Sequence, residues 1–138
     1  MAFRDFDCFE INDVYNISGQ GDFHLIFKDF TILVDSKLYT NKVGSVSRDK
    51  IKRDLNNNEH MTFAWLVSMD TMIDTFDKAP FMFEWLSGNK CVCYINSLQK
   101  NDEPIEILRA IYFVCKNLYM LISNEELDAL YLEIEIVR

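Results

Sequence analysis

The chain has 138 residues, of which 49% are hydrophobic and 26% charged, and its formal net charge is −8. This length fits one domain, residues 1–138, that can bury a core without the support of a metal or a disulfide. The acidic balance argues against nucleic-acid binding, which depends on Lys and Arg side chains that neutralise phosphates. It permits a basic protein as the partner, although the simpler explanation is that the acidity keeps the protein in solution.

The acidity is concentrated in the second part of the chain. Residues 1–58 carry a net charge of −1, and residues 59–138 carry a net charge of −7. The N-terminus lacks a basic and then apolar leader, and no apolar run reaches the roughly 18–20 residues that span a bilayer. We therefore expect no membrane partner and a cytoplasmic location, in which the four cysteines stay reduced.

The first third of the chain predicts an antiparallel meander over roughly 6–40. Residues 23–27 and 30–34 are rich in strand-forming side chains, and Lys28-Asp29 between them suits a tight turn. The two glycines of Gly19-Gln20-Gly21 mark another turn.

One run within this meander resembles a known family. Residues 9–21, from Phe9 to Gly21, are similar to the first strand and glycine turn of the second, β-barrel domain of elongation-factor-Tu-type translation GTPases. The resemblance covers about a tenth of the chain and implies a strand, a turn and a strand over 9–27. It does not imply GTP binding, because the sequence contains no glycine-rich phosphate loop followed by Lys-Ser or Lys-Thr.

Residues 41–58 are polar, and we expect a connecting loop in which Ser47 is a candidate start of a short helix. Either the loop is simply solvated, or its basic side chains contact a phosphate or an acidic partner. These basic residues are Lys42, Arg48, Lys50, Lys52 and Arg53.

Residues 59–77 predict a helix, because Met61, Trp65 and Met69 recur on one side of it together with further apolar residues. Pro80 lacks an amide donor and ends the helix. Residues 81–86 are apolar and fit either a strand or one or two helical turns. After a turn at 87–89, residues 91–95 predict a buried strand.

Residues 104–122 predict a long helix, apolar over more than half of its circumference, and we expect neighbours to bury it on several sides. Its polar side is interrupted by Phe113 and Met120, which fit either further core packing or a surface for a protein or a second copy of the chain. Ser123 and Glu126 have capping-box spacing, which predicts a new short helix over about 124–130. Strict alternation then predicts a strand over 131–137, with a continued helix as the alternative.

Together these elements predict a single α+β domain. Its antiparallel sheet contains the N-terminal meander and strands near 91–95 and 131–137, and this sheet packs against helices near 59–77 and 104–122.

The sequence contains no recognisable catalytic signature. Cys91 and Cys93 are explained more simply as core residues than as metal ligands, because no second pair follows them. His24 and His60 each lack an evident partner, although a Cys–His pair assembled by the fold stays an alternative. We predict no catalytic residue, no metal site and no cofactor.

The acids of the predicted 59–77 helix are the candidate partner-binding residues. Asp70, Asp74 and Asp77 would share one helix face, and Phe63 among them would be an exposed aromatic side chain with an acidic rim, as at many protein interfaces. The complete candidate set is Glu59, Phe63, Asp70, Asp74, Asp77 and Glu84.

These features favour a small acidic protein-binding domain. We expect an inhibitor or immunity protein, antitoxin-like in character, that neutralises a more basic protein such as a bacterial toxin domain. The first alternative is a structural or adaptor subunit of a larger assembly, with homo-oligomers among its forms. The second alternative is an enzyme with no recognisable motif.

Overall fold

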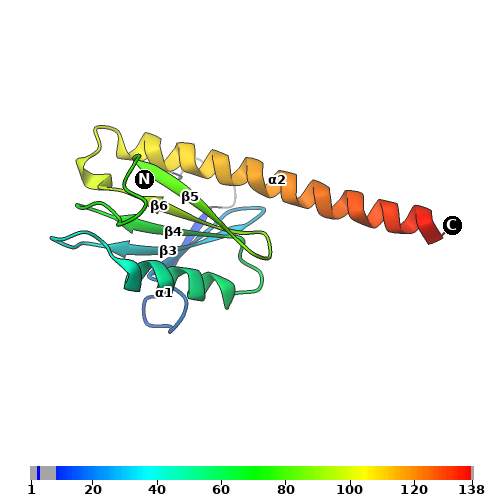
Figure 1. Ribbon diagram of the computed structural model, residues 1–138, viewed down its shortest axis with the longest axis horizontal. Helices are drawn as coiled ribbons and strands as arrows, with labels where there is room; N and C mark the ends of the chain where they lie inside the picture. Colours follow the sequence, from blue (N-terminus) through cyan, green and yellow to red (C-terminus); the bar gives the residue numbers. More distant parts are fainter. Residues whose placement is uncertain (1–2, 4–8, 138) are drawn as a thin grey trace.

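A computed structural model shows an open sheet between two helices, and it confirms the predicted α+β class. The structure describes Phe3 and residues 9–137, with the backbone alone described at 125–131 and 133–137. The helix α2 (Pro104–Val137) lies on one face of the sheet, and α1 (Ser45–Asn56) lies on the other (Figure 1).

The described residues form a six-stranded sheet with the strand order β1-β2-β3-β4-β6-β5. The strands are β1 (Glu10–Asp13), β2 (Phe23–Ile26), β3 (Thr31–Lys37), β4 (Phe63–Ser68), β5 (Phe81–Leu86) and β6 (Lys90–Ile95), and a 3-10 helix η1 (Leu98–Lys100) precedes α2. The central strands β3, β4 and β6 are parallel, and the other neighbours are antiparallel. The sheet is therefore mixed and not wholly antiparallel as predicted, because α1 carries the chain back before β4 begins.

The predicted meander is confirmed from residue 10 to residue 37, while residues 6–8 lie outside the described part of the chain. The turn before β2 requires glycine at position 21. Gly21 has φ +74°, and a Cβ there would lie 2.8 Å from Cδ2 of Leu33 and 2.9 Å from the carbonyl oxygen of Val34. Backbone this close to β3 leaves room for no other residue type.

The segment predicted as a connecting loop contains α1. Its buried residues Ser47, Ile51, Asp54 and Leu55 follow the spacing of one helix face, and this stripe packs on the sheet. The remaining positions of α1 are polar except for the exposed Val46, and only Ile51 and Leu55 of the buried residues are apolar, so the apolar stripe is narrow. This explains why the composition of 41–58 indicated a loop.

The predicted helix over 59–77 is wrong. Residues 63–68 form β4, in which all six residues are buried. A central strand covered by helices on both faces reads as a continuous apolar run, which has no alternation to distinguish it from a buried helix. Residues 69–80 form the loop to β5, and Val43 pairs with Ile73 of that loop as an isolated bridge.

The predicted helix over 104–122 is confirmed, but it continues to Val137. The separate helix over 124–130 and the strand over 131–137 are therefore wrong. No Gly or Pro follows Pro104 in the sequence, so nothing in the backbone stops the helix, and the capping-box spacing at Ser123 occurs inside it.

Two apolar clusters form the core, one on each face of the sheet. The cluster beneath α2 contains Trp65, Cys93 and Ile111, and the cluster beneath α1 contains Leu33, Ile51 and Tyr94. Burial of Cys91 and Cys93 in the first cluster confirms that they are core cysteines. The helix α2 covers one face only and is not buried on several sides.

Candidate functional site

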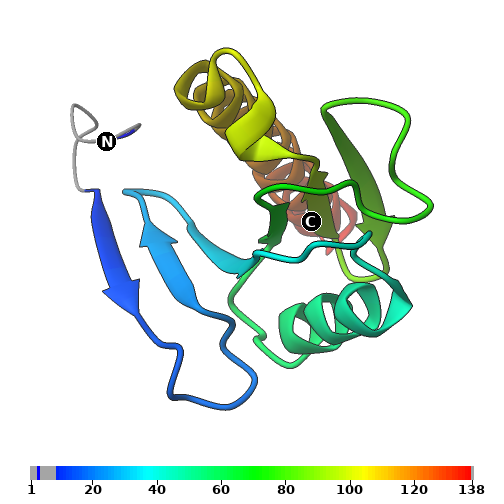
Figure 2. The same cartoon turned by 90° about the vertical axis from the view of Figure 1, so that its left-hand side faces the viewer.

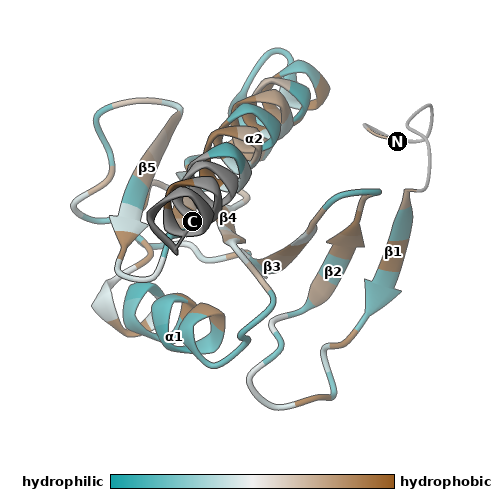
Figure 3. Ribbon diagram, turned by 90° about the vertical axis from the view of Figure 1, so that its right-hand side faces the viewer, coloured by the Kyte–Doolittle hydropathy of each residue, from teal (hydrophilic) through white to brown (hydrophobic). Residues whose placement is uncertain are grey.

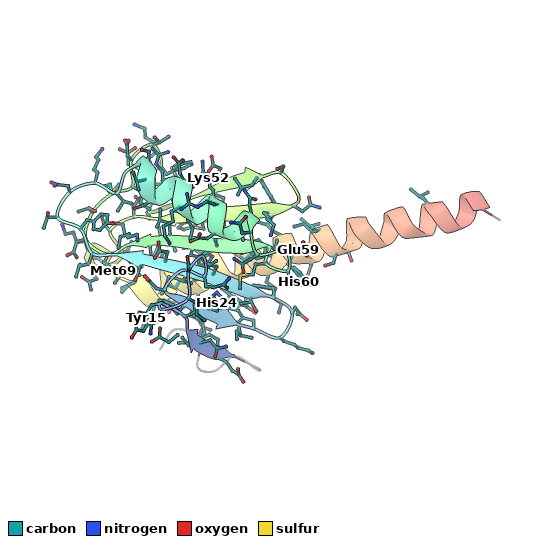
Figure 4. All side chains as sticks on the ribbon, turned by 90° about the horizontal axis from the view of Figure 1, so that it is seen from below. Tyr15, His24, Lys52, Glu59, His60 and Met69 are labelled. Atoms are coloured by element: carbon teal, nitrogen blue, oxygen red, sulfur yellow. The ribbon has the colours of Figure 1, made fainter. Side chains whose placement is uncertain are left out.

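The predicted partner-binding acids do not share a helix face. Phe63 is a core residue of β4 with 1% of its surface exposed, so the expectation of an exposed aromatic was wrong. Asp70, Asp74 and Asp77 lie in the loop between β4 and β5, and Glu84 lies in the edge strand β5. Glu59 and His60 lie in the turn that follows α1, with Lys52 on the helix itself (Figure 4).

Three of these acids are paired with the basic residues of the same protein. Asp77 contacts Lys42 at 3.0 Å, Asp74 contacts Arg48 at 3.8 Å, and Glu84 contacts Lys52 at 3.0 Å. Each of these ion pairs joins the 42–52 region to the loop or edge strand beside it. The positive and negative clusters seen in the sequence therefore neutralise each other in part.

A different group of charged residues lies at the carboxyl end of β3. The antiparallel register of β2 and β3 pairs Phe23 with Val34, which places Asp22 across from Asp35. Lys37 lies two residues further along β3, so its side chain is on the same face as that of Asp35. Its Nζ is 3.0 Å from Oδ2 of Asp35. Two carboxylates and one ammonium group thus lie together.

Asp35 is the most buried member of this group, with only 3% of its side chain exposed. Burial raises the pKa of the Asp35 carboxyl, Lys37 opposes that shift, and the charge and hydrogen bond of Asp22 raise the pKa further. Within the described residues, Oδ2 of Asp35 has no hydrogen-bond donor in good geometry, although it contacts Lys37 as an ion pair. This oxygen therefore retains capacity for a proton or a cation.

Hydrogen bonds to β3 hold both the backbone and the side chain of Asp22 in place. The Asp22 amide donates to the carbonyl of Val34 at 2.9 Å. The amide and hydroxyl of Ser36 donate to Oδ2 of Asp22 at 2.8 and 3.1 Å. The close approach required at Gly21 sets the start of β2, so the glycine turn positions the carboxylate that follows it.

Polar residues gather at the carboxyl ends of all three parallel strands. Lys37 ends β3, the buried Ser68 ends β4, and the buried Asn96 follows β6. Asn96 accepts a hydrogen bond from the Ile73 amide and donates to the carbonyls of Phe76 and Ala79, which fixes the β4–β5 loop. In open α/β sheets this end of the strands is where ligands bind.

The histidines and cysteines do not form a catalytic pair in the described residues. His24 Nε2 lies 2.9 Å from the carbonyl of Gln20, and burial lowers the pKa of His24. Burial raises the pKa of Cys91 and of Cys115 to about 12, so neither is a thiolate near neutral pH. Cys8 lies outside the described residues.

The outer part of α2 projects beyond the sheet (Figures 1 and 3). Its packing against the core extends from Ile107 to Tyr119. After that point Met120 and Leu121 are 53% and 60% exposed, and Leu132 is 65% exposed. The sequence from 125 to 135 adds five acids. The described side chains of the outer part of α2 are thus exposed and apolar, at Met120 as the surface alternative expected and at Leu121 where burial was expected.

Among the described residues, no group of three or more His, Cys, Asp or Glu side chains could hold a metal ion. No helix in that part of the chain has both the length and the apolarity to cross a membrane. Comparison of the chain with family models, with curated proteins and with solved structures finds no match.

Proposed function

We propose that Asp22, Asp35 and Lys37 bind a divalent cation and hydrolyse phosphate esters. The observation that carries this proposal is the almost wholly buried Asp35 carboxyl, whose Oδ2 lacks a hydrogen-bond donor among the described residues and lies 3.0 Å from Nζ of Lys37, with Asp22 across from it in the register of β2 and β3. A buried carboxyl whose pKa is raised by burial and by a second carboxyl is typical of functional sites.

Magnesium suits this group better than a metal that needs a complete protein cage. Mg²⁺ is commonly held by one or two carboxylates, with water and substrate phosphate completing its coordination. The pair Asp22 and Asp35 supplies those two carboxylates, which is consistent with the absence of a larger ligand cluster in the described residues. The cation would take the place of the proton that the buried Asp35 carboxyl binds more readily because its pKa is raised.

The chemistry then follows from the charges. A divalent cation held by Asp22 and Asp35 would supply a bound water of lowered pKa beside the substrate phosphate. Hydrolysis of the ester P–O bond would give a phosphate and an alcohol, with the proton of the water passing to the leaving oxygen. The ammonium group of Lys37 stabilises the negative charge that develops on the phosphate oxygens.

Hydrolysis of bis(p-nitrophenyl) phosphate with Mg²⁺ or Mn²⁺ tests this proposal. We expect release of p-nitrophenol that Asp35→Asn lowers by roughly a hundredfold or more, while the matched variant of an exposed α1 acid, Asp49→Asn, leaves it unchanged. Lys37→Met is expected to lower turnover and to retain cation binding. Absence of cation-dependent release, or equal rates for the wild type and Asp35→Asn, would overturn the proposal.

We further propose that α2 binds a basic protein, since its exposed apolar residues and nearby acids give it a surface of its own. This moves the expected partner-binding surface from the 59–84 acids, several of which are paired internally, to the outer part of α2. An inhibitor of a basic toxin domain or an adaptor subunit would each use such a helix in a partner's groove.

Binding of a fluorescent Lys/Leu amphipathic helical peptide, followed by anisotropy at two salt concentrations, tests this second proposal. We expect salt-sensitive binding that the double variant Met120→Gln, Leu121→Gln weakens at least tenfold. The control Ile105→Gln alters an equally exposed apolar residue at the other end of α2 and is expected to retain binding. Equal weakening by both variants would contradict an outer binding surface.

A further inference from the structure

A cavity of about 310 Å³ lies against the α2-facing side of the sheet. Its walls come from β1 to β4, η1 and the start of α2, and they include Leu25, Val67 and Leu108. Figure 2 shows α2 over one half of the sheet, with β1 and β2 at the other end of the strand order. The cavity thus lies where α2 no longer covers the sheet and β1 and β2 begin.

Among the described residues, the lining of this cavity is apolar with one exception. Ser36 is the one polar residue in that part of the lining, and its hydroxyl already donates to Asp22. None of the lining residues that the structure describes is charged. Water needs two to four polar partners to occupy such a space, so an apolar cavity is filled preferentially by an apolar molecule.

The size and the aromatic walls narrow the class of ligand. An apolar cavity of about 150 Å³ accommodates a single benzene ring, and this cavity has about twice that volume. Phe9, Phe23 and Trp65 contribute rings to the walls, and aromatic pairs gain from edge-to-face or offset contact. We propose that the cavity binds a neutral aromatic molecule of about two fused rings.

This site shares only Ser36 with the charged group at the end of β3, through the hydrogen bonds of Ser36 to Asp22. Val34 and Ser36 line the cavity, whereas Asp35 and Lys37 alternate with them and lie on the opposite face of the strand. Loss of cation binding would therefore leave this proposal standing, and loss of aromatic binding would leave the cation site standing.

Titration of the full chain with naphthalene, followed by methyl NMR spectroscopy, tests the proposal. We expect saturable shifts at Leu25, Val67 and Leu108, with the methyls of Leu66 and Val92 on the α1 face unchanged. Decane, titrated in parallel, is expected to give shifts at least tenfold weaker at equal concentration. Equal or stronger shifts with decane would overturn the aromatic assignment.

Two variants that fill the cavity complete the experiment. Val67→Phe and Leu108→Phe each place a ring in the space and are expected to abolish the naphthalene shifts. The control Val46→Phe makes the first substitution at a position of α1 that is 83% exposed, and it is expected to bind as the wild type does. Shifts that persist in both filling variants, shifts centred on Leu121, or no shifts in the wild type would overturn the proposal.

Discussion

Asp35 is the residue whose surroundings differ most from those of an ordinary surface carboxyl. It is buried on β3 between Lys37 and Asp22, and the net result is a pKa above the usual value of 3.8. Burial and the second carboxylate together outweigh the lysine. The ionised form of the Asp35 carboxyl is therefore less favourable in the folded chain than in water.

The stability of Asp35→Asn as a function of pH tests this balance. A carboxyl with a raised folded-state pKa weakens the folded state once pH rises through that pKa, because its ionised form is disfavoured there. We expect the variant to match the wild type below about pH 4 and to become the more stable of the two as pH rises towards 7. Urea unfolding in metal-free buffer measures the difference, and a variant less stable than the wild type at pH 7 would contradict it.

Gly21→Ala tests the backbone approach that positions Asp22. A Cβ at this position meets β3 within 3 Å at a positive φ, so we expect a loss of roughly 2 kcal/mol or more in the free energy of unfolding. Gly88 is the matched control, since it has φ +77° and nothing within 4 Å of a Cβ. Gly88→Ala should cost only about 1 kcal/mol, from backbone strain alone, and equal losses would refute the contact.

Sequence alone did not identify this charged group. Asp35-Ser36-Lys37 looks like an ordinary polar turn, and Asp22 is remote from it along the chain. Only the register of β2 against β3 brings the two carboxylates together. The glycine pair was a usable signal, because it indicated a tight turn immediately before Asp22.

At the scale of elements, local signals sufficed where turn residues or helix-start residues marked the ends of a segment. The meander, the 91–95 strand and the start of α2 were all predicted because alternation, turn residues or helix-start residues marked them. β4 was mistaken for a helix because both of its faces are buried. The length of α2 was underestimated because alternation over 131–137 fits a strand as well as a helix.

Lys90 joins the end of α1 to the β6 strand. Its Nζ donates to the carbonyls of Leu55, Asn58 and Met61 at 3.0, 2.7 and 2.6 Å, so it caps the last turn of the helix. We expect Lys90→Met to lower the free energy of unfolding by about 1–3 kcal/mol. It should also speed amide hydrogen exchange over 53–57. Lys100→Met, at an exposed position, is expected to do neither.

The outer part of α2 is expected to contribute little to the stability of the domain. Asn124→Pro interrupts the helix beyond its last core contact, where proline costs about 3 kcal/mol relative to alanine in a helix interior. We expect lower helical circular dichroism but a chemical-denaturation midpoint within experimental error of Asn124→Ala. A large drop in that midpoint would show that the outer helix packs on the sheet.

At the scale of the whole molecule, only part of the negative charge behind the net charge of −8 is free to attract a partner, because several acids form ion pairs within the chain. The basic residues near α1 are paired with acids of the β4–β5 loop and β5, which removes much of the charge contrast seen in the sequence. Two features are therefore the candidates for binding: the carboxyl pair at the end of β3 and the outer part of α2.

The central claim is that Asp22 and Asp35 hold a divalent cation, and calorimetric titration with Mn²⁺ and Mg²⁺ near pH 7 tests it most directly. We predict binding at one cation per chain, lost in Asp35→Asn and retained in the exposed-acid control Asp49→Asn. Equal binding by the wild type and Asp35→Asn, or no binding by the wild type, would contradict the account.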